Sequence, residues 1–556
     1  MQPETSRHPL RPLLLGLAVF LVYLATLTRA HSGDDIQWIM QVESAVMGTS
    51  ALHPASTALP GAGAVAVDAT APRPRYLLAL PTFAGLFAGA RQLGWPGQAV
   101  GAVQFANALL AAVGVVWFYL ALRQVIADRL SVVASLGLAS SHAWWYYATH
   151  LDYPIAAHAL SCMVLYLLFS IIRPNEHDGV QRRAFALGAV NALAILYLAT
   201  RIVLVPVVAI TLHASAPPSG APEPRRLRGP ATGYLAGLAV SLVLVLGFFA
   251  LSSFRATGHP PPQLWKKATY AGAVAHGVAP QDLPKALYGF AKSIVVYPAA
   301  GSEEPRHLLA ASGVFTRAAF LTWYALVAMV AVAPFGLFVL NRQRLLACRV
   351  PATALVWWFV LELPFVVYWE PSYVKWLIGL LIPWWGLVGI LAASAFADEP
   401  TAHRIVVRAV GGMVGVVFGV NLIAGFLPSS RADADPWLRA TDILTRLSTP
   451  ADLFVALEHH PLNFQLPYFG RRRVVSIDLV YLSEGRDEIS AARAVRSLIQ
   501  ATAADGARVY VYPCGEPQLR RLQALAAPAC SQLEPIRLGG IADSGLTMCR
   551  AVGPAP

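Results

Sequence analysis

Residues 10–44, LRPLLLGLAVFLVYLATLTRAHSGDDIQWIMQVES, contain the pattern that decides the fold. The first half of this stretch is almost wholly apolar and, at roughly 20 residues, is long enough to cross a ~30 Å hydrocarbon core. The second half is a polar loop with the acidic pair Asp34 and Asp35. A basic segment precedes the apolar run and no convincing small-residue cleavage site follows it, so we interpret the run as a retained first membrane helix.

The composition extends this interpretation to the whole chain. Of 556 residues, 56% are hydrophobic and only 13% are charged, and the mean hydropathy is +0.54. These values are too apolar for a soluble protein of this size. The net charge of +12 does not indicate nucleic acid as a partner, because the surplus Arg and Lys lie in short loops between apolar spans. The membrane is therefore the expected solvent.

Apolar segments of membrane-spanning length recur as far as Leu427. The segment 76–94 is also apolar, but Pro81 interrupts it and arginines flank it, so we predict a helix in the membrane interface there. With that choice every second loop is basic, which places the N-terminus in the cytoplasm. We predict about eleven transmembrane helices, at 10–29, 99–122, 130–147, 154–172, 184–199, 202–214, 231–253, 318–340, 352–368, 374–396 and 405–427.

Three segments lie on the outer face in this topology: 30–98, 254–317 and the tail from about 428. Asp34 and Asp35 open a helix in the first of them, and taken alone they favour simple capping of its positive end. Two short loops bring further polar side chains to the same level, and an arginine between two adjacent spans should meet an anion near the outer interface. These side chains are His150, Asp152, Arg201, Glu370, Tyr373 and Lys375.

Polar groups inside the spans are costly and usually line a protein-filled or wet cavity. Glu362, His158 and Asn191 are such groups. The aromatic run 144–147, beside Asp152, is more typical of an interfacial belt than of a substrate platform. The outer segment 254–317 carries Lys and Arg among prolines and aromatics, which suits an ordered cap over a phosphate head group.

The tail, 429–556, changes character. Helical patterns at 434–448, 489–503 and 516–527 alternate with strand-like runs at 452–457, 474–479 and 508–512, which predicts a small α/β domain with a mainly parallel sheet. It lacks a phosphate-binding glycine loop, so we expect no nucleotide site. Three of the five cysteines, Cys514, Cys530 and Cys549, fall here and allow one disulfide and a spare thiol in an oxidising space.

This layout resembles the GT-C class of glycosyltransferases, multi-spanning enzymes that include protein O-mannosyltransferases and the lipid A aminoarabinose transferase. The pair Asp34-Asp35 resembles the acidic pair of the family's first outer loop, and Asp152 its second-loop acid. The segment 374–376, leading to Pro383, resembles the entry into a late span. The similarity covers roughly residues 10–400. Where the family often has a Pro-Pro pair before the interfacial helix, residues 72–75 of this chain read Pro-Arg-Pro-Arg.

The resemblance implies inverting transfer of a hexose or pentose from a polyprenyl-phosphate donor to a glycan, lipid or protein acceptor. The expected place is the extracytoplasmic face of a bacterial-type inner membrane. It implies Asp34 as the base that deprotonates the acceptor, with Asp35 orienting either Asp34 or the acceptor. No cofactor is implied, and a divalent metal stays open. The substrate-binding residues would be Asp152, His150, Glu370, Tyr373, Arg201 and Lys375, the last two on the phosphate.

Two other function classes compete with a transferase. Glu362 and His158 would suit the translocation path of a transporter or flippase for a lipid-linked or small polar substrate. The sequence shows no internal repeat of the kind common in transporters, and its polar mass lies on one face. A non-catalytic assembly subunit that uses the outer domain to bind a partner is the third alternative.

Overall fold

The computed structural model describes residues 10–31, 33–47, 77–172, 179–215, 225–257, 282–296, 325, 349–369, 373–395, 399–431, 434–457, 462–477, 488–512, 532–536 and 548–552. The expected span 318–340 (apart from residue 325), the expected helix 516–527 and Glu370 lie outside these residues. The chain forms two compact units. The first comprises Met1–Leu27, Arg73–Ala79 and Gln104–Pro428, and the second Thr28–Pro72, Leu80–Val103 and Ser429–Pro556.

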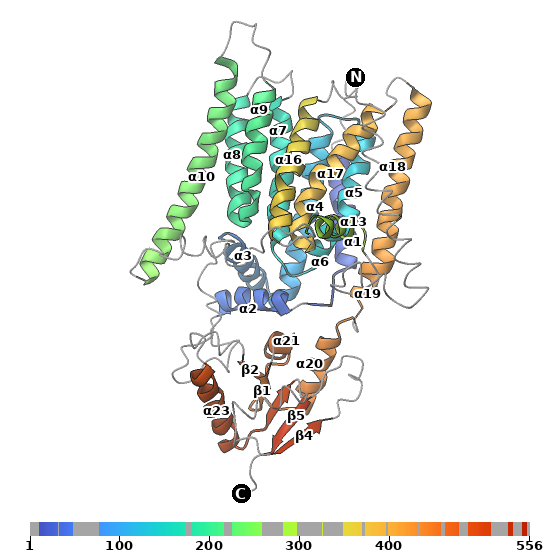
Figure 1. Ribbon diagram of the computed structural model, residues 1–556. Coiled ribbons are helices and arrows are strands. Elements are labelled where there is room, and N and C mark those ends of the chain that lie inside the picture. The colour runs from blue at the N-terminus through green and yellow to red at the C-terminus, as the bar shows by residue number, and fades with distance from the viewer. Residues whose placement is uncertain are drawn as a thin grey trace. The chain divides into compact units, whose positions relative to one another are not determined.

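The first unit is a bundle of apolar helices (Figure 1). Within the described residues, six helical stretches are long and apolar enough to cross a membrane: Ala99–Leu122, Pro154–Ile172, Gly229–Leu251, Arg349–Tyr368, Val374–Ser394 and Pro400–Ser429. The chain is therefore a multi-pass membrane protein. The helices are α1 (Leu10–Ala25), α4 (Ala99–Leu122), α5 (Asp128–Ser140), α6 (His142–Thr149), α7 (Pro154–Ile172), α8 (Val180–Tyr197), α9 (Leu204–Ala214), α10 (Arg225–Thr257), α13 (Asp282–Ile294), α16 (Arg349–Trp369), α17 (Val374–Ser394) and α18 (Pro400–Val420).

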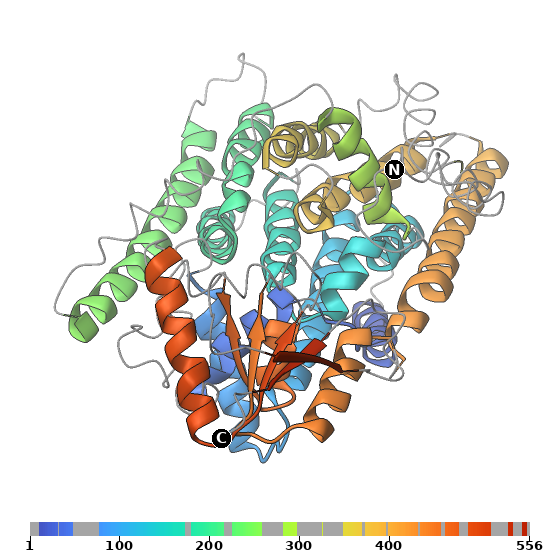
Figure 2. The same cartoon turned by 60° about the horizontal axis from the view of Figure 1, so that its bottom comes forward.

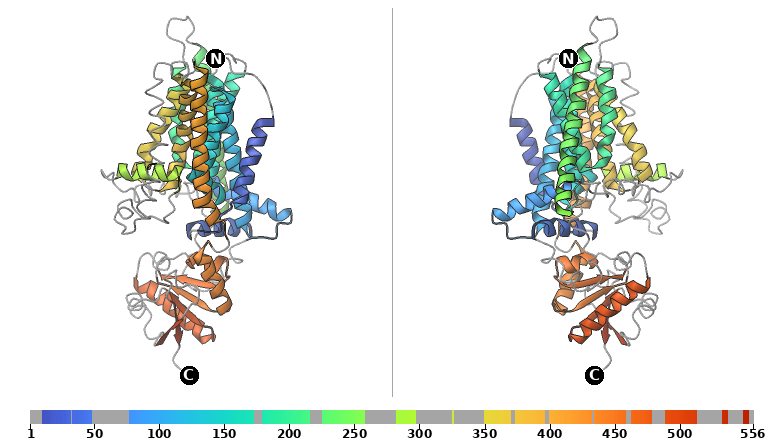
Figure 3. Two further views of the ribbon diagram at one scale, coloured as in Figure 1. Left: turned by 90° about the vertical axis from the view of Figure 1, so that its right-hand side faces the viewer. Right: turned by 90° about the vertical axis from the view of Figure 1, so that its left-hand side faces the viewer.

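Helix α17 lies at the centre of this bundle and α10 at its margin. In the apolar stretch of α17, 83% of the residues are buried, against 11% for α10. The surface of α10 thus faces lipid except where Gly188 of α8 and Gly237 of α10 let the two helices approach closely. Helix α13 runs crosswise to α16 and α17 (Figure 3). An amphipathic helix in this orientation is typical of the membrane interface.

The predicted span 130–147 is broken at Ser141, whose extended backbone separates α5 from α6. Trp144 and Trp145 of α6 are fully buried. Trp145 stacks on Phe426 at a ring-centroid distance of 4.3 Å and donates through Nε1 to Thr26 Oγ1 at 2.8 Å. The expected interfacial belt is therefore wrong for these two tryptophans, because protein encloses both side chains.

A π-helical turn, Asn421–Phe426, follows α18. The fully buried Asn421 donates through Nδ2 to the carbonyl oxygens of Ser140 (2.7 Å) and Ile294 (2.8 Å). Its Oδ1 accepts from the Val296 N–H at 2.7 Å. One amide thus fixes the end of α18 to the ends of α5 and α13, and its donors and acceptor are satisfied.

The second unit contains α2 (Gly33–Met47), most of α3 (Ala79–Gln92) and the tail, and Figure 2 shows the tail's sheet between α23 (Glu488–Ala504) and α20 (Pro436–Leu447). The strand order is β2-β1-β3-β5-β4. The first three strands pair in parallel, whereas β5 is antiparallel to both β3 and β4. The sequence predicts a mainly parallel sheet and does not predict the antiparallel pairing of β5 with β3 and β4. The elements are β1 (Leu453–Ala456), α21 (Leu462–Tyr468), β2 (Arg473–Ser476), β3 (Val509–Tyr512), β4 (Gln532–Ile536) and β5 (Met548–Val552).

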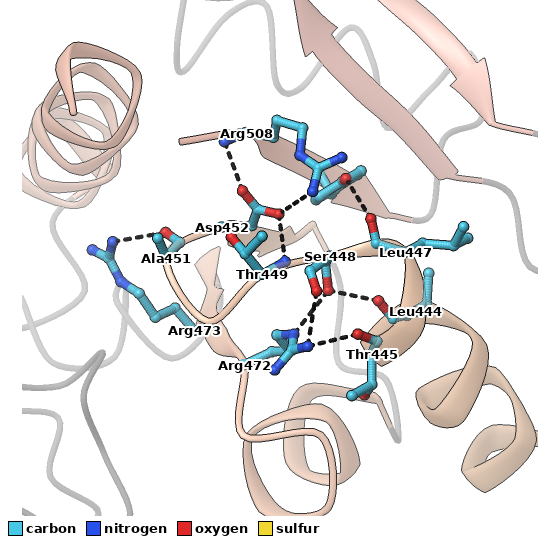
Figure 4. A network of polar contacts seen from close by, with 11 residues as sticks. Leu444, Thr445, Leu447, Ser448, Thr449, Ala451, Asp452, Arg472, Arg473 and Arg508 are labelled. Atoms are coloured by element: carbon cyan, nitrogen blue, oxygen red, sulfur yellow. Dashed lines mark hydrogen bonds and ion pairs between the residues drawn. The ribbon is translucent and has the colours of Figure 1, made fainter. Parts of the chain in front are cut away.

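Charged side chains fasten the start of this sheet (Figure 4). Asp452 accepts from the Arg508 guanidinium at 2.9 Å and from the backbone N–H groups of Thr449 and Arg508. Burial by itself would raise the pKa of Asp452, but these hydrogen bonds outweigh it and bring the pKa below its usual value. Arg472 donates to Ser448 and to carbonyl oxygens at the end of α20, which ties that helix to β2.

Candidate functional site

The loop between α6 and α7 is held from α4 by two amide side chains. Gln104 donates to the carbonyl oxygen of Thr149 at 2.9 Å. Asn107, three residues further on and fully buried, donates to the carbonyl oxygens of His150 (2.9 Å) and Asp152 (2.8 Å). Positions i and i+3 share one face of a helix, so α4 presents both amides to the same loop. The backbone that carries Asp152 is thereby fixed.

Asp152 and Lys375 form an ion pair. Lys375 Nζ lies 2.6 Å from Asp152 Oδ2, and Asp152 Oδ1 accepts from the backbone N–H of Tyr153 at 2.9 Å. The same ammonium lies 4.4 Å from the centre of the Tyr153 ring, a cation–π distance. The side chains of Lys375 and Asp152 are 12% and 11% exposed. Protein therefore shields most of this ion pair from solvent, but both side chains keep some exposed surface.

The start of α17 adds a helix dipole beside Lys375. Tyr373, 39% exposed, is the residue before the helix. The positive end of a helix dipole favours an anion, and a lysine in the same turn adds a full charge. His150 is buried, stacks on Tyr146 and contacts the Tyr146 carbonyl oxygen through Nδ1 at 2.8 Å.

Arg201 forms a second ion pair, with Glu362, in which both side chains are 1% exposed. Trp358 Nε1 donates to the carboxylate at 2.6 Å, and Thr200 Oγ1 accepts from the guanidinium at 3.2 and 3.3 Å. Gly379 of α17 packs against the pair, and a methyl group there would overlap the Glu362 carboxylate. Sequence position suggested that Arg201 meets an anion near the interface. The structure supplies that anion from within the protein.

His158 and Asn191 are also buried in the helical bundle. Asn191 Nδ2 donates to the Tyr234 hydroxyl at 2.7 Å, which links α8 to α10. His158 is 1% exposed and interacts electrostatically with the Arg201 guanidinium, and neither ring nitrogen has a hydrogen-bond partner among the described residues. Glu362 and Asn191 therefore serve helix packing, which hydropathy alone could not distinguish from a polar path.

The acidic pair lies at the start of α2 in the second unit. The backbone of Asp34 and Asp35 belongs to the first helical turn, and the Asp35 side chain is 7% exposed. The position of the Asp34 side chain lies outside the described part of the chain. The apolar residues Ile36, Ile39 and Val42 of α2 are fully buried.

Sequence reasoning missed two polar residues that hold this helix, Glu43 and Tyr468. Glu43 is 1% exposed, and its Oε1 accepts from the Tyr468 hydroxyl at 2.6 Å. Glu43 was visible as a carboxylate in an apolar helix, but its partner is 425 residues away in the chain. Among the described residues, no group of three or more His, Cys, Asp or Glu side chains could hold a metal ion.

No protein-family model matches the sequence, and no curated protein matches it significantly. Solved structures do match. The crystal structure of ArnT from Cupriavidus metallidurans bound to undecaprenyl phosphate aligns with a TM-score of 0.60 at 12% identity, over 98% of this chain and 98% of that one. The Archaeoglobus fulgidus oligosaccharyltransferase in complex with Zn and sulfate aligns with a TM-score of 0.53 at 11% identity, over 89% of this chain and 67% of that one. At such identities the likeness establishes the fold.

Proposed function

We propose that this chain, which has the fold of the GT-C glycosyltransferases, transfers a sugar from a polyprenyl-phosphate donor to an acceptor on the extracytoplasmic face of the membrane. The observation that carries the proposal is the alignment with ArnT, because it includes both the helical bundle and the tail and covers 98% of each chain. A lipid-linked donor also gives a reason for an enzyme embedded in lipid, since the hydrocarbon tail of such a substrate stays in the bilayer.

The reaction needs one base and one cation. In the proposed step the acceptor oxygen attacks the anomeric carbon and the bond from that carbon to the phosphate oxygen breaks. The configuration at the anomeric carbon is inverted. The acceptor proton passes to Asp34, with Asp35 orienting the acceptor, and polyprenyl phosphate leaves with the electron pair. A positive charge near the departing oxygen lowers the barrier because negative charge grows there in the transition state.

Lys375 is the proposed cation. Its Nζ is held between Asp152 and the Tyr153 ring at the start of α17, where the helix dipole also favours an anion. A bound phosphate would share the Lys375 ammonium with Asp152. The backbone of Asp152 is held in place by the hydrogen bond from Asn107. Tyr373 lies two residues before Lys375 in the sequence, and His150 lies two residues before Asp152. We propose that these two residues and Glu370 contact the donor head group.

Arg201 receives a different role. Its charge is neutralised by Glu362 and its side chain is 1% exposed, so binding a phosphate would require breaking a buried ion pair. We propose that Arg201 instead fixes the turn Ala199–Val203 to α16, with Gly379 of α17 packed against the pair.

Mass spectrometry of lipid-linked sugars tests the proposal. A strain lacking the protein should accumulate one polyprenyl-phosphate sugar and lose one glycan modification, and the wild-type gene should reverse both changes. A gene encoding the Asp34→Asn/Asp35→Asn double variant, expressed at the same level, should reverse neither. Unchanged lipid-linked sugars in the deletion strain would contradict a transferase. Accumulation that the double variant reverses would remove the acidic pair from the mechanism.

A further inference from the structure

The helix that carries Asp34 and Asp35 belongs to the same compact unit as the C-terminal tail. This grouping joins segments that are about 400 residues apart in the sequence. Buried hydrogen bonds from the tail reach the chain near both ends of α2.

The first contact fixes His31, which lies two residues before the start of α2. The backbone N–H of His31 donates to Asp435 Oδ2 at 3.1 Å, and Gln465 Nε2 donates to the His31 carbonyl oxygen at 3.1 Å. Gln465 also donates to Asp435 Oδ2 at 2.9 Å, and the His31 ring stacks on Phe469. Asp435 and Gln465 are both at most 2% exposed. The entry into α2 is thus bound through its backbone, which no change of the His31 side chain removes.

Asp435 does two things at once. Its Oδ1 accepts from the backbone N–H groups of Trp437 and Leu438 and so caps α20, while its Oδ2 holds His31. The start of α20 and the start of α2 are therefore fixed by one carboxylate. An N-cap has little freedom to move, because its oxygen must stay aligned with the first turn of its helix.

The second contact fixes the other end of α2. Glu43 Oε1 accepts from the Tyr468 hydroxyl at 2.6 Å and from the Ala99 N–H at 2.7 Å. Tyr468 belongs to α21 and is fully buried. Burial, and then the charge of Glu43, raise the pKa of Tyr468, so its hydroxyl stays a donor across the physiological range. A buried carboxylate that loses this donor would be left undersatisfied.

We infer that the C-terminal domain acts as a clasp that sets the position of α2, with Asp435 and Gln465 at one end and Tyr468 at the other. If α2 carries the base, as the proposed function holds, these are positioning residues for catalysis. They touch neither donor nor acceptor in this account. The domain then contributes to turnover itself, in addition to any part it has in selecting the acceptor.

Hydrogen exchange on the full chain in lipid nanodiscs tests the clasp with Tyr468→Phe. This variant removes the hydroxyl that reaches Glu43, and the peptide covering 33–47 should exchange roughly tenfold faster. Tyr512→Phe is the matched control, because Tyr512 is also fully buried and its hydroxyl donates to Asn463 at 2.9 Å within the tail alone. The control should leave exchange in 33–47 unchanged. Equal exchange in all three proteins, or an equal rise in both variants, would overturn the clasp.

Kinetics and a conservative variant separate positioning from general damage. Tyr468→Phe should lower kcat about tenfold with less than a twofold change in the KM for donor, because α2 is displaced while the donor site is intact. Glu43→Gln, which keeps an acceptor oxygen for Tyr468, should retain more of both protection and kcat than Glu43→Ala. Equal loss in the two Glu43 variants would contradict the hydrogen-bond account.

The exchange measurement also keeps this inference distinct from the proposed function. Faster exchange in 33–47 of Tyr468→Phe, together with a wild-type protein that transfers no sugar from any polyprenyl phosphate, would leave the clasp standing and refute the transferase. Normal transfer by wild type and by Tyr468→Phe, with unchanged exchange in 33–47, would leave the transferase standing and refute the clasp.

Discussion

Two ion pairs adjoin the same helix, α17, and differ in how far protein encloses them. Arg201 and Glu362 are each 1% exposed and pack against Gly379. Lys375, one turn earlier in α17, and Asp152 are 12% and 11% exposed. The first pair is completed by Trp358 and Thr200, so both charges are met by the protein. The second lies at the start of a helix, where a ligand can share the lysine.

Charge and depth in the membrane therefore do not by themselves identify a functional residue. Breaking a fully buried pair leaves an uncompensated charge in a region of low dielectric constant, which costs several times more than losing a partly solvated one. We therefore expect substitutions at the Arg201 pair to act on stability and those at the Lys375 pair to act on turnover.

Glu362→Gln should be the most destabilising of these changes, at about 3–5 kcal/mol, because Arg201 keeps its charge and loses its counter-ion. Thermal unfolding in one detergent, compared with wild type, measures the loss. The double variant Arg201→Met/Glu362→Leu removes both charges and should recover most of the stability. A Glu362→Gln protein that melts with wild type would contradict a structural role for the pair.

Acid should weaken the second unit through His31. Burial lowers the pKa of His31 to about 4, against the opposing charge of Asp435, whereas the unfolded chain has a value near 6.5. Between pH 6.5 and 4 the unfolded state binds a proton that the folded state does not, so stability falls as the pH falls, by about 3 kcal/mol in total. Unfolding of the full chain as a function of pH measures this loss.

His31→Phe is the control for that pH dependence, since it retains a ring beside Phe469 and cannot titrate. Its stability should vary less between pH 4 and 6.5 than that of wild type. The same slope in both proteins would show that another group carries the effect.

Lys375→Met should cost only about 1–2 kcal/mol of stability, since Asp152 keeps some contact with solvent and still accepts from the Tyr153 N–H. Its sugar-transfer rate should fall by about 100-fold or more, as expected when a group that stabilises charge in the transition state is lost. Lys375→Arg, which keeps the charge, should retain more activity. A Lys375→Met enzyme with normal kcat would remove this lysine from the reaction.

Arg446→Ala gives the lower end of the scale. Arg446 and Asp442 pair on the surface of α20 at 2.6 Å, with side chains 76% and 59% exposed. Their loss should change the unfolding free energy by about 0.5 kcal/mol or less. A loss comparable to that of Glu362→Gln would mean that exposure does not separate the pairs.

Much of the bundle could be predicted from the sequence because membrane spans are recognisable by their length and hydropathy. The expected spans 99–122 and 154–172 coincide with α4 and α7. The break between α5 and α6 was missed because Ser141 interrupts the helix without interrupting the apolar pattern. The antiparallel edge of the sheet was missed because β4 and β5 carry polar residues among apolar ones.

The side-chain pairings were predictable only where loops are short. Asp152 and Lys375 were expected at one level, and the structure brings them together, because each lies a few residues from the end of a span. The partner of Arg201 could not be inferred, since Glu362 is 161 residues away and its approach depends on how α16 packs. The same holds for Tyr468 and Glu43, which become neighbours only when the tail folds against α2.

Release of free polyprenyl phosphate by the purified protein tests the proposed sugar transfer directly. Wild type and the Asp34→Asn/Asp35→Asn variant would be placed in nanodiscs with lipid-linked sugars and acceptor extracted from the deletion strain, and the products quantified by mass spectrometry. We expect acceptor-dependent release of polyprenyl phosphate by wild type and at least a 100-fold slower rate in the variant. Equal rates in the two proteins, or no release by wild type from the lipids that accumulate in the deletion strain, would refute the proposed transfer.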